Sequence, residues 1–179
     1  MEPKATPFRD RPEFLRGRNG EHLVADRAKR KGWFVIPSYD YGGEDGNKAP
    51  KLEGLNRGIV VPDLDIARDG QRRWVEVKTK QAPTLTRVTN RMEHGINVRH
   101  WESYREVERI TGCKVFLVIY EEESGDVLGA SLDAIVKWHG GKLRETRMRK
   151  NGSDDGAMFY FARDSLKLLY NVDAPEPTP

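Results

Sequence analysis

The alternation of apolar and polar positions between residues 60 and 80 predicts a β-hairpin. Its centre is Asp69-Gly70, a strong turn signal, because both central positions of a type I′ turn need positive φ. This turn sets Asp63 opposite Glu76 across the two strands. Successive side chains point to opposite faces, so one face is apolar and faces the core. The other face carries four charged residues, namely Asp63, Asp65, Glu76 and Lys78.

Apolar residues at helical spacing predict one helix on each side of the hairpin. The first helix spans 19–32, with Asn19 as the N-cap and Gly32 as the stop. The second spans 97–112, with Asn97 as the N-cap. Its apolar positions are Trp101, Tyr104, Val107 and Ile110.

Continuous apolar runs predict the remaining strands. A short strand at 33–36 ends at Pro37, and the apolar run within 113–122 is typical of a buried central strand. Three further elements are a strand at 126–132, a helix at 132–139 and a terminal hairpin on either side of 150–156.

The order of these elements, αβββαβ, predicts an α/β fold with a mixed central sheet, flanking helices and a C-terminal hairpin extension. The chain has 179 residues, which suits one domain with a sizeable core. We place this domain at 8–171. Residues 1–7 and 172–179 are rich in proline and are expected to be disordered tails.

Composition narrows the class of protein. The 31 basic and 28 acidic side chains nearly balance, so net charge alone indicates only a mild preference for polyanions. The single cysteine, Cys113, excludes an internal disulfide framework. Residues 1–14 lack the apolar core of a signal peptide, and no apolar run reaches membrane-spanning length. We therefore expect a cytoplasmic protein that does not bind membranes.

The two facing carboxylates of the hairpin need an explanation. Like charges directly opposite each other destabilise a hairpin unless they share a proton or bind a cation. Mg²⁺ suits this site because the ligands are hard oxygens and no histidine or cysteine cluster favours a softer metal. The alternative is a solvated sheet face on which glutamate and lysine simply alternate.

Pro62-Asp63, followed after a turn by Glu76-Val77-Lys78, resembles the signature of the PD-(D/E)XK nuclease superfamily. Residues 19–36 also look like the first helix and strand of its Holliday-junction-resolvase-like branch, and the resemblance extends to residue 121. It implies a restriction-endonuclease-like core and a DNA endonuclease that uses Mg²⁺, with Mn²⁺ as an expected substitute.

The resemblance also implies roles for individual residues. Asp63 and Glu76 would hold the metal, Lys78 would orient or activate the attacking water, and Glu21 would assist from the first helix. Asp65 remains an alternative metal ligand, because it shares the face of Asp63. Glu21 has an alternative role as well, since a glutamate in a first turn after Asn19 favours the positive end of the helix dipole.

Several cations and polar residues are candidates for contact with nucleic acid. Some follow the motif strand, and others lie in the long glycine-rich connection that precedes the hairpin. Their alternative role is ordinary surface charge. The set is Lys80, Gln81, Arg91, His94, Arg99, Lys48, Lys51 and Arg57, with His94 expected in a loop.

Two further possibilities stay open at this stage. The chain could be a non-catalytic subunit that binds nucleic acid or assembles a complex on the nuclease scaffold. The motif does not exclude RNA as the substrate, because it addresses the scissile phosphate rather than the sugar. A homodimer is compatible with cleavage of both strands of a duplex.

Overall fold

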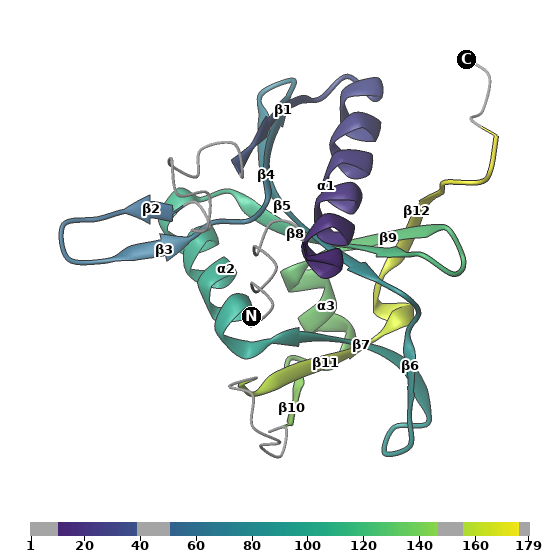
Figure 1. Cartoon of the computed structure of the whole chain (residues 1–179). Coiled ribbons are helices and arrows are strands. Elements are labelled where there is room, and N and C mark those ends of the chain that lie inside the picture. The colour runs from purple at the N-terminus through teal and green to yellow at the C-terminus, as the bar shows by residue number, and fades with distance from the viewer. Residues whose placement is uncertain (1–10, 39–50, 147–155, 176–179) are drawn as a thin grey trace, which may run out of the picture.

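The protein is built on a six-stranded mixed sheet, seen here in a computed structural model that describes residues 11–38, 51–146 and 156–175 (Figure 1). The strand order is β1-β4-β5-β8-β9-β12. Strands β5 and β8 are parallel, whereas the other neighbours are antiparallel. The bounds are β1 (Phe34–Pro37), β4 (Leu64–Arg68), β5 (Gln71–Lys80), β8 (Lys114–Glu121), β9 (Asp126–Ser131) and β12 (Lys167–Asn171).

Helices cover both faces of this sheet. Helix α1 (Pro12–Arg30) packs on one face, where Val24 and Ala25 join the buried apolar residues of β4 and β5. Helices α2 (Val98–Thr111) and α3 (Leu132–Trp138) pack on the other face and share a larger core with β8. The predicted order αβββαβ is confirmed as α1, β1, β4, β5, α2 and β8, with hairpins inserted between these elements.

The central hairpin has the predicted register. Asp69 and Gly70 both have positive φ, at 50° and 74°, and Asp65 pairs with Trp74. The apolar face packs against α1 as expected. The charged face, however, is not solvated, because α2 covers it and Trp74 on that face belongs to the larger core. The alternative of a solvated face is therefore wrong.

Helix α1 begins earlier than predicted. It starts at Pro12, which takes the first-turn position that tolerates proline, so Asn19 lies inside the helix and the N-cap prediction is wrong. Gly20, the next residue, has a packing role. A Cβ atom at Gly20 would lie 2.1 Å from Thr79 Oγ1 of β5. The glycine thus permits a close approach of α1 to the strand.

The second helix agrees with the sequence at its ends. Asn97 accepts a hydrogen bond from Arg99 N, and Gly112 has φ of 69° at the C-cap. Trp101, Tyr104 and Val107 are buried as predicted. Ile110 is 47% exposed, so its assignment to the core is wrong.

A second sheet lies beyond the main one, with the strand order β10-β11-β7-β6. The pairing of β10 (Arg144–Thr146) with β11 (Met158–Ala162) confirms the terminal hairpin. Strands β6 (Thr84–Thr86) and β7 (Arg91–Asn97) occupy a segment in which His94 was expected in a loop, and that expectation is wrong. Strand β7 pairs with β11, whose residues come about 60 positions later.

Smaller features complete the fold. Strands β2 (Lys51–Glu53) and β3 (Gly58–Val60) form a separate hairpin in the connection before β4. Strand β12 was not predicted, and it follows a single 3₁₀ turn at Arg163–Ser165. Val172 N donates to Gly125 O at 2.9 Å, so ordered structure continues past the predicted boundary at 171. No helix in the described part of the chain combines the length and apolar character needed to cross a membrane.

Candidate active site

Asp63 sits at the point where β4 begins. The register of β4 with β5 ends at the pair Leu64 and Val75. Beyond this pair, the Asp63 carboxylate and not its backbone bonds to β5. Its Oδ2 atom accepts a hydrogen bond from Val77 N at 2.8 Å. The hairpin register therefore places Asp63 beside Glu76, as the sequence indicates.

Glu76 is a buried carboxylate, only 1% exposed, in the middle of β5. Its Oε1 atom accepts a hydrogen bond from Lys78 Nζ, two residues further along the same strand face. Its Oε2 atom is also buried, and no described residue makes a hydrogen bond of normal geometry to it, although the Tyr104 phenol interacts with the Glu76 carboxylate from α2. Leaving a buried charged oxygen without a donor costs about 1–3 kcal/mol or more. This atom is thus a ready acceptor for a cation or a bound donor.

Lys78 provides the positive charge of the cluster. Burial alone would lower the pKa of its ammonium, but the charges of Glu76 and Asp63 raise that pKa above its usual value. The lysine is therefore protonated at neutral pH and neutralises part of the negative charge around it.

Glu21 joins the cluster from α1. This helix packs on the face of β5 opposite to the face that carries Glu76 and Lys78. Burial and the charge of Glu76 raise the pKa of Glu21, while Lys78 lowers it. Because α1 begins at Pro12, Glu21 lies near the middle of the helix rather than in its first turn. The helix dipole acts within the first and last turns, so it does not explain this glutamate. The close contact of Gly20 with Thr79 is what brings Glu21 to the strand.

The cluster as a whole carries more negative than positive charge. Burial, and next the charge of Glu76, raise the pKa of Asp63 well above its usual range, although Lys78 and the Val77 amide oppose this shift. Three carboxylates, Asp63, Glu76 and Glu21, thus lie around Lys78, and we call these four residues the acidic cluster. Such an arrangement is stable if some carboxylates hold protons or if a cation binds among them.

Two residues of α2 complete the surroundings of Glu76, and the sequence interpretation missed both. Burial, the charges of Glu76 and Asp63 and a hydrogen-bonding interaction with the Glu76 carboxylate raise the pKa of the Tyr104 phenol. Burial and the charge of Lys78 lower the pKa of His100. The two rings lie 6.2 Å apart, centre to centre. Their spacing of four residues, which places them on one helix face, was the available signal.

Asp65 occupies a different environment from Asp63. Arg72 binds it with two nitrogens, Nη2 at 2.5 Å from Oδ2 and Nε at 3.0 Å from Oδ1. This bidentate pair satisfies the Asp65 carboxylate within the hairpin. The structure therefore brings Asp63 and not Asp65 to Glu76 and Lys78.

Three of the predicted nucleic-acid contacts line one groove. Lys51, Arg57 and Arg99 border a cavity of about 480 Å³ between the β2–β3 hairpin and α2. Asp63, Glu76, Lys78 and Glu21 do not line this groove, but Arg99 precedes His100, whose pKa responds to Lys78. Arg57 also pairs with Glu106 at 2.5 Å. Lys48 lies outside the described residues.

The other predicted contacts are dispersed. Lys80 follows Lys78 on the same strand face, and burial and Lys78 lower its pKa. Gln81 donates to Glu123 at 2.8 Å, and the Arg91 guanidinium lies 4.9 Å from the Trp138 ring centre. His94 is only 2% exposed, and its Nε2 lies 2.9 Å from Glu121 Oε1. Direct contact of His94 with a phosphate is therefore not available in this structure.

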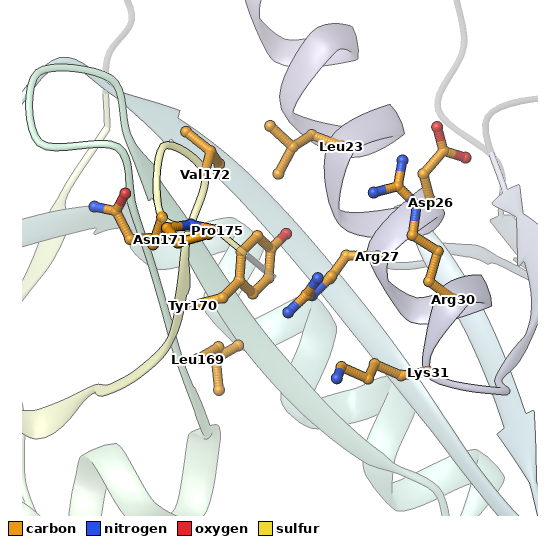
Figure 2. A pocket seen from close by; sticks show the side chains of 11 residues that line it. Leu23, Asp26, Arg27, Arg30, Lys31, Leu169, Tyr170, Asn171, Val172 and Pro175 are labelled. Carbon is orange, nitrogen blue, oxygen red and sulfur yellow. The ribbon is translucent and has the colours of Figure 1, made fainter. Parts of the chain in front are cut away.

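A larger cavity, of about 570 Å³, lies away from the cluster between α1 and the segment after β12 (Figure 2). Figure 2 shows Arg27 beside the ring of Tyr170, and the guanidinium is 5.0 Å from the ring centre. None of the clustered carboxylates lines this cavity. Its size therefore does not mark it as the reaction site.

The donor set of the cluster suits a hard divalent cation. No three His, Cys, Asp or Glu side chains within residues 11–38, 51–146 and 156–175 already converge as a metal-binding group. In the cluster Lys78 instead acts as the counter-ion of Glu76. The unpartnered Oε2 of Glu76 and the raised pKa of Asp63 and of Glu21 show that this compensation is incomplete. Carboxylate oxygens of this kind are the ligands that Mg²⁺ prefers.

Comparisons with known proteins give structural neighbours only. No family model matches the chain, and no curated protein sequence matches it. The Holliday junction resolvase Hjc of Archaeoglobus fulgidus is 9% identical, with 83% of this chain and 90% of that chain covered at a TM-score of 0.49. A nuclease from a fusselovirus is 13% identical, with 92% and 89% covered at a TM-score of 0.47. At these values the chain's function has to be argued from its own site.

Proposed function

We propose that this chain is a Mg²⁺-dependent DNA endonuclease of the PD-(D/E)XK type. The observation that carries the proposal is the pairing of Lys78 with a buried Glu76 whose second oxygen lacks a donor. Asp63 and Glu21 surround this pair from two other elements. In a purely structural ion pair, all acceptor oxygens would have donors. The Lys78–Glu76 pair instead leaves part of the negative charge of the carboxylates without a partner.

The carboxylates would hold the metal, with Asp63 and Glu76 as the principal ligands and Glu21 as the third. When bound, Mg²⁺ supplies a water of lowered pKa and neutralises charge that develops on the phosphate. Mn²⁺ would take the same oxygen ligands. Asp63 is already oriented, because Val77 N holds one of its oxygens.

Lys78 has the second role in this proposal. Its ammonium is protonated and lies where a phosphate oxygen next to Glu76 would need a donor. A preorganised positive charge of this kind stabilises the transition state of phosphodiester hydrolysis. Tyr104 and His100 flank the cluster from α2.

The proposed substrate follows from the surrounding charge. We assign Lys51, Arg57 and Arg99 in the groove beside α2, and Lys80 beyond Lys78, to contacts with backbone phosphates on either side of the reacting one. DNA is the proposed substrate, and RNA is the alternative that a substrate panel resolves. A homodimer would allow cleavage of both strands of a duplex.

A second candidate is a non-catalytic subunit that binds nucleic acid on the same scaffold. The acidic cluster weighs against it, because three carboxylates beside a polyanion weaken binding unless a cation occupies them. Binding that is independent of metal, without turnover, would favour this candidate.

The test is cleavage of labelled single-stranded DNA, duplex DNA, a branched junction and one RNA. Each substrate is incubated with Mg²⁺, with Mn²⁺ and with chelator. We expect metal-dependent cleavage, which Glu76→Gln lowers by about 10²–10³-fold, the usual loss when one charge-stabilising group is removed.

Asp65→Asn is the matched control, because Asp65 lies on the same hairpin face but is bound by Arg72. Its cleavage should stay close to that of the unmodified protein. Undiminished cleavage in both Glu76→Gln and Lys78→Ala would overturn the proposal.

A further inference from the structure

The β6–β7 hairpin exposes apolar side chains where it projects from the molecule (Figure 1). Leu85 is 59% exposed, Val88 in the turn is 81% exposed, and Met92 is 43% exposed. Leu85 pairs with Met92 across the two strands, so their side chains share one face. We call Leu85, Val88 and Met92 the apolar tip.

The opposite face of this hairpin is anchored to the protein. Glu93 is buried and accepts hydrogen bonds from Arg144 of β10 and from Thr89 Oγ1, the latter at 2.8 Å. Asn90 N donates to Thr86 O at 2.8 Å and closes the turn. Arg91 lies over Trp138 of the neighbouring helix. The hairpin is therefore held as a fixed projection, with the apolar tip directed away from these anchors.

The hairpin that carries the apolar tip follows β5, the strand that carries Glu76 and Lys78. Residues 92, 94 and 96 of β7 point to the same side, about 7 Å apart in successive pairs. His94 contacts Glu121, and Glu121 is the register partner of Lys80 at the end of β5. Lys80 in turn shares a strand face with Lys78 and Glu76. Leu85 follows Lys80 by five residues, which span at most about 18 Å, so a nucleic-acid strand bound at Lys78 and Lys80 is long enough to reach Leu85 and its partner Met92.

The small size of the apolar tip and the cation beside it favour nucleic acid over a protein partner. A stable protein interface buries about 800 Å² on each side, which is more than three side chains on a narrow hairpin provide. A two-stranded ribbon fits a DNA groove, and apolar side chains can wedge between base steps. Arg87, in the same turn as Val88, adds a cation for the flanking phosphates.

We infer that the apolar tip inserts between bases of the DNA bound at the acidic cluster and unstacks them. The inference rests on the proposed nuclease function and adds to it a preference for DNA that is easily unstacked, at a branch, a nick or a flexible pyrimidine–purine step. Unstacking costs least at such places. The hairpin would thus select where along the DNA the acidic cluster acts.

The test measures unstacking directly and without cleavage. Duplex and branched DNAs carry 2-aminopurine at successive positions, and the protein is added with Ca²⁺ in place of Mg²⁺, because Ca²⁺ occupies carboxylate ligands in a looser geometry than Mg²⁺. We expect a several-fold rise in fluorescence at one or two positions. The triple variant Leu85→Ser, Val88→Ser, Met92→Ser should lose this rise at saturating protein, while its affinity for DNA changes much less.

Two control variants separate the apolar tip from other surfaces. Leu168→Ser with Leu169→Ser removes two exposed leucines from the edge strand β12 and should leave the fluorescence rise unchanged. Arg87→Ala should weaken binding but keep the rise at saturation. Both variants should fold normally, because all three side chains are exposed.

Three results would overturn the inference. The first is no fluorescence rise with DNA that the protein cleaves, which would leave the proposed function standing. The second is an unchanged rise in the triple variant. The third is loss of a dimer in the triple variant, seen by light scattering, which would identify the apolar tip as a contact between copies. Absence of any DNA binding or cleavage would overturn both proposals together.

Discussion

Two buried glutamates on neighbouring parallel strands show how differently one fold can treat the same side chain. Glu76 of β5 and Glu121 of β8 are each only 1% exposed. Glu121 is the register partner of Lys80, four residues after Glu76, so the two glutamates lie on the same face of the sheet about 13 Å apart along the strands. Burial, strand environment and residue type are thus closely matched.

The partners of the two carboxylates are not matched. Arg163 Nη2 and Ser124 Oγ lie 2.9 and 3.1 Å from Glu121 Oε2, and His94 lies 2.9 Å from Oε1. Burial alone would raise the pKa of Glu121, but Arg163 and His94 lower it below its ordinary value. Around Glu76, by contrast, one oxygen lacks a donor, and burial and like charge raise the pKa of Asp63 and Glu21.

This difference separates a structural carboxylate from a candidate reactive one. Glu121 links β8 to β7 and to the turn before β12, so its bonds hold the two sheets together. The negative charge around Glu76 is not fully compensated, and this costs stability. Proteins retain such a destabilising arrangement at sites that bind a ligand.

The largest effect on stability is expected at Glu121. Glu121→Gln removes the charge that Arg163 and His94 share, and breaking a buried charge network costs about 3–5 kcal/mol. Glu76→Gln in chelator should change the free energy of unfolding by no more than about 1 kcal/mol, because Asp63 and Glu21 remain to neutralise Lys78. Urea unfolding of both variants measures the difference, and equal losses would erase the contrast between the two sites.

Lys78→Ala should separate metal binding from catalysis. Without its ammonium, Glu76, Asp63 and Glu21 are less compensated, so Mg²⁺ should bind more tightly than to the unmodified protein. Cleavage should nevertheless fall by about 10²–10³-fold, because the charge beside the phosphate is lost. Calorimetric titration with Mg²⁺ and a cleavage assay measure the two effects. Weaker Mg²⁺ binding would contradict the role given to Lys78.

Asp63→Asn should alter the dependence of stability on pH. The raised pKa of Asp63 means that the folded protein holds this proton more tightly than the unfolded chain does. As pH rises above the ordinary pKa of 3.8, the folded protein therefore loses stability through this group until its raised pKa is passed. In chelator, the stability of Asp63→Asn relative to the unmodified protein should therefore increase as the pH rises from 3.8 to the raised pKa. A constant difference in melting temperature between pH 4 and neutrality would refute this.

The smallest expected effects are on stability and cleavage when glycines of α1, the helix that positions Glu21, are replaced. A Cβ at Gly17 would have no described atom within 4 Å, so Gly17→Ala should stabilise the helix by about 0.5–1 kcal/mol. Gly20→Ala should lose that gain, because its Cβ meets Thr79 Oγ1. Gly20→Ala should also lower cleavage while Gly17→Ala does not. Equal stabilisation by both would mean that α1 does not depend on the close approach at Gly20.

The sequence was sufficient where structure is local. Asp69-Gly70 determines its own turn, so the register that sets Asp63 opposite Glu76 could be predicted from adjacent residues. Asn97 and Gly112 likewise mark the ends of α2 through contacts within a few residues. The start of α1 was missed because Asn19-Gly20 resembles a helix cap, while Gly20 is present for a contact with β5.

The remainder depends on partners far along the chain. Strand β7 pairs with β11, and the buried His94 contacts Glu121 of β8, which Arg163 holds from the turn before β12. No local pattern contains such pairings, which explains why His94 was expected in a loop. The environment of Glu76 is similarly non-local, since Tyr104 and His100 reach it from α2.

The most direct measurement is the binding of Mn²⁺, followed by the loss of the electron paramagnetic resonance signal of the free ion. The unmodified protein and Asp65→Asn should bind Mn²⁺ with similar affinity, and Mg²⁺ should displace it. Glu76→Gln should bind it at least about tenfold more weakly. Equal binding by Glu76→Gln and the unmodified protein would show that the unpartnered oxygen of Glu76 is not a cation site.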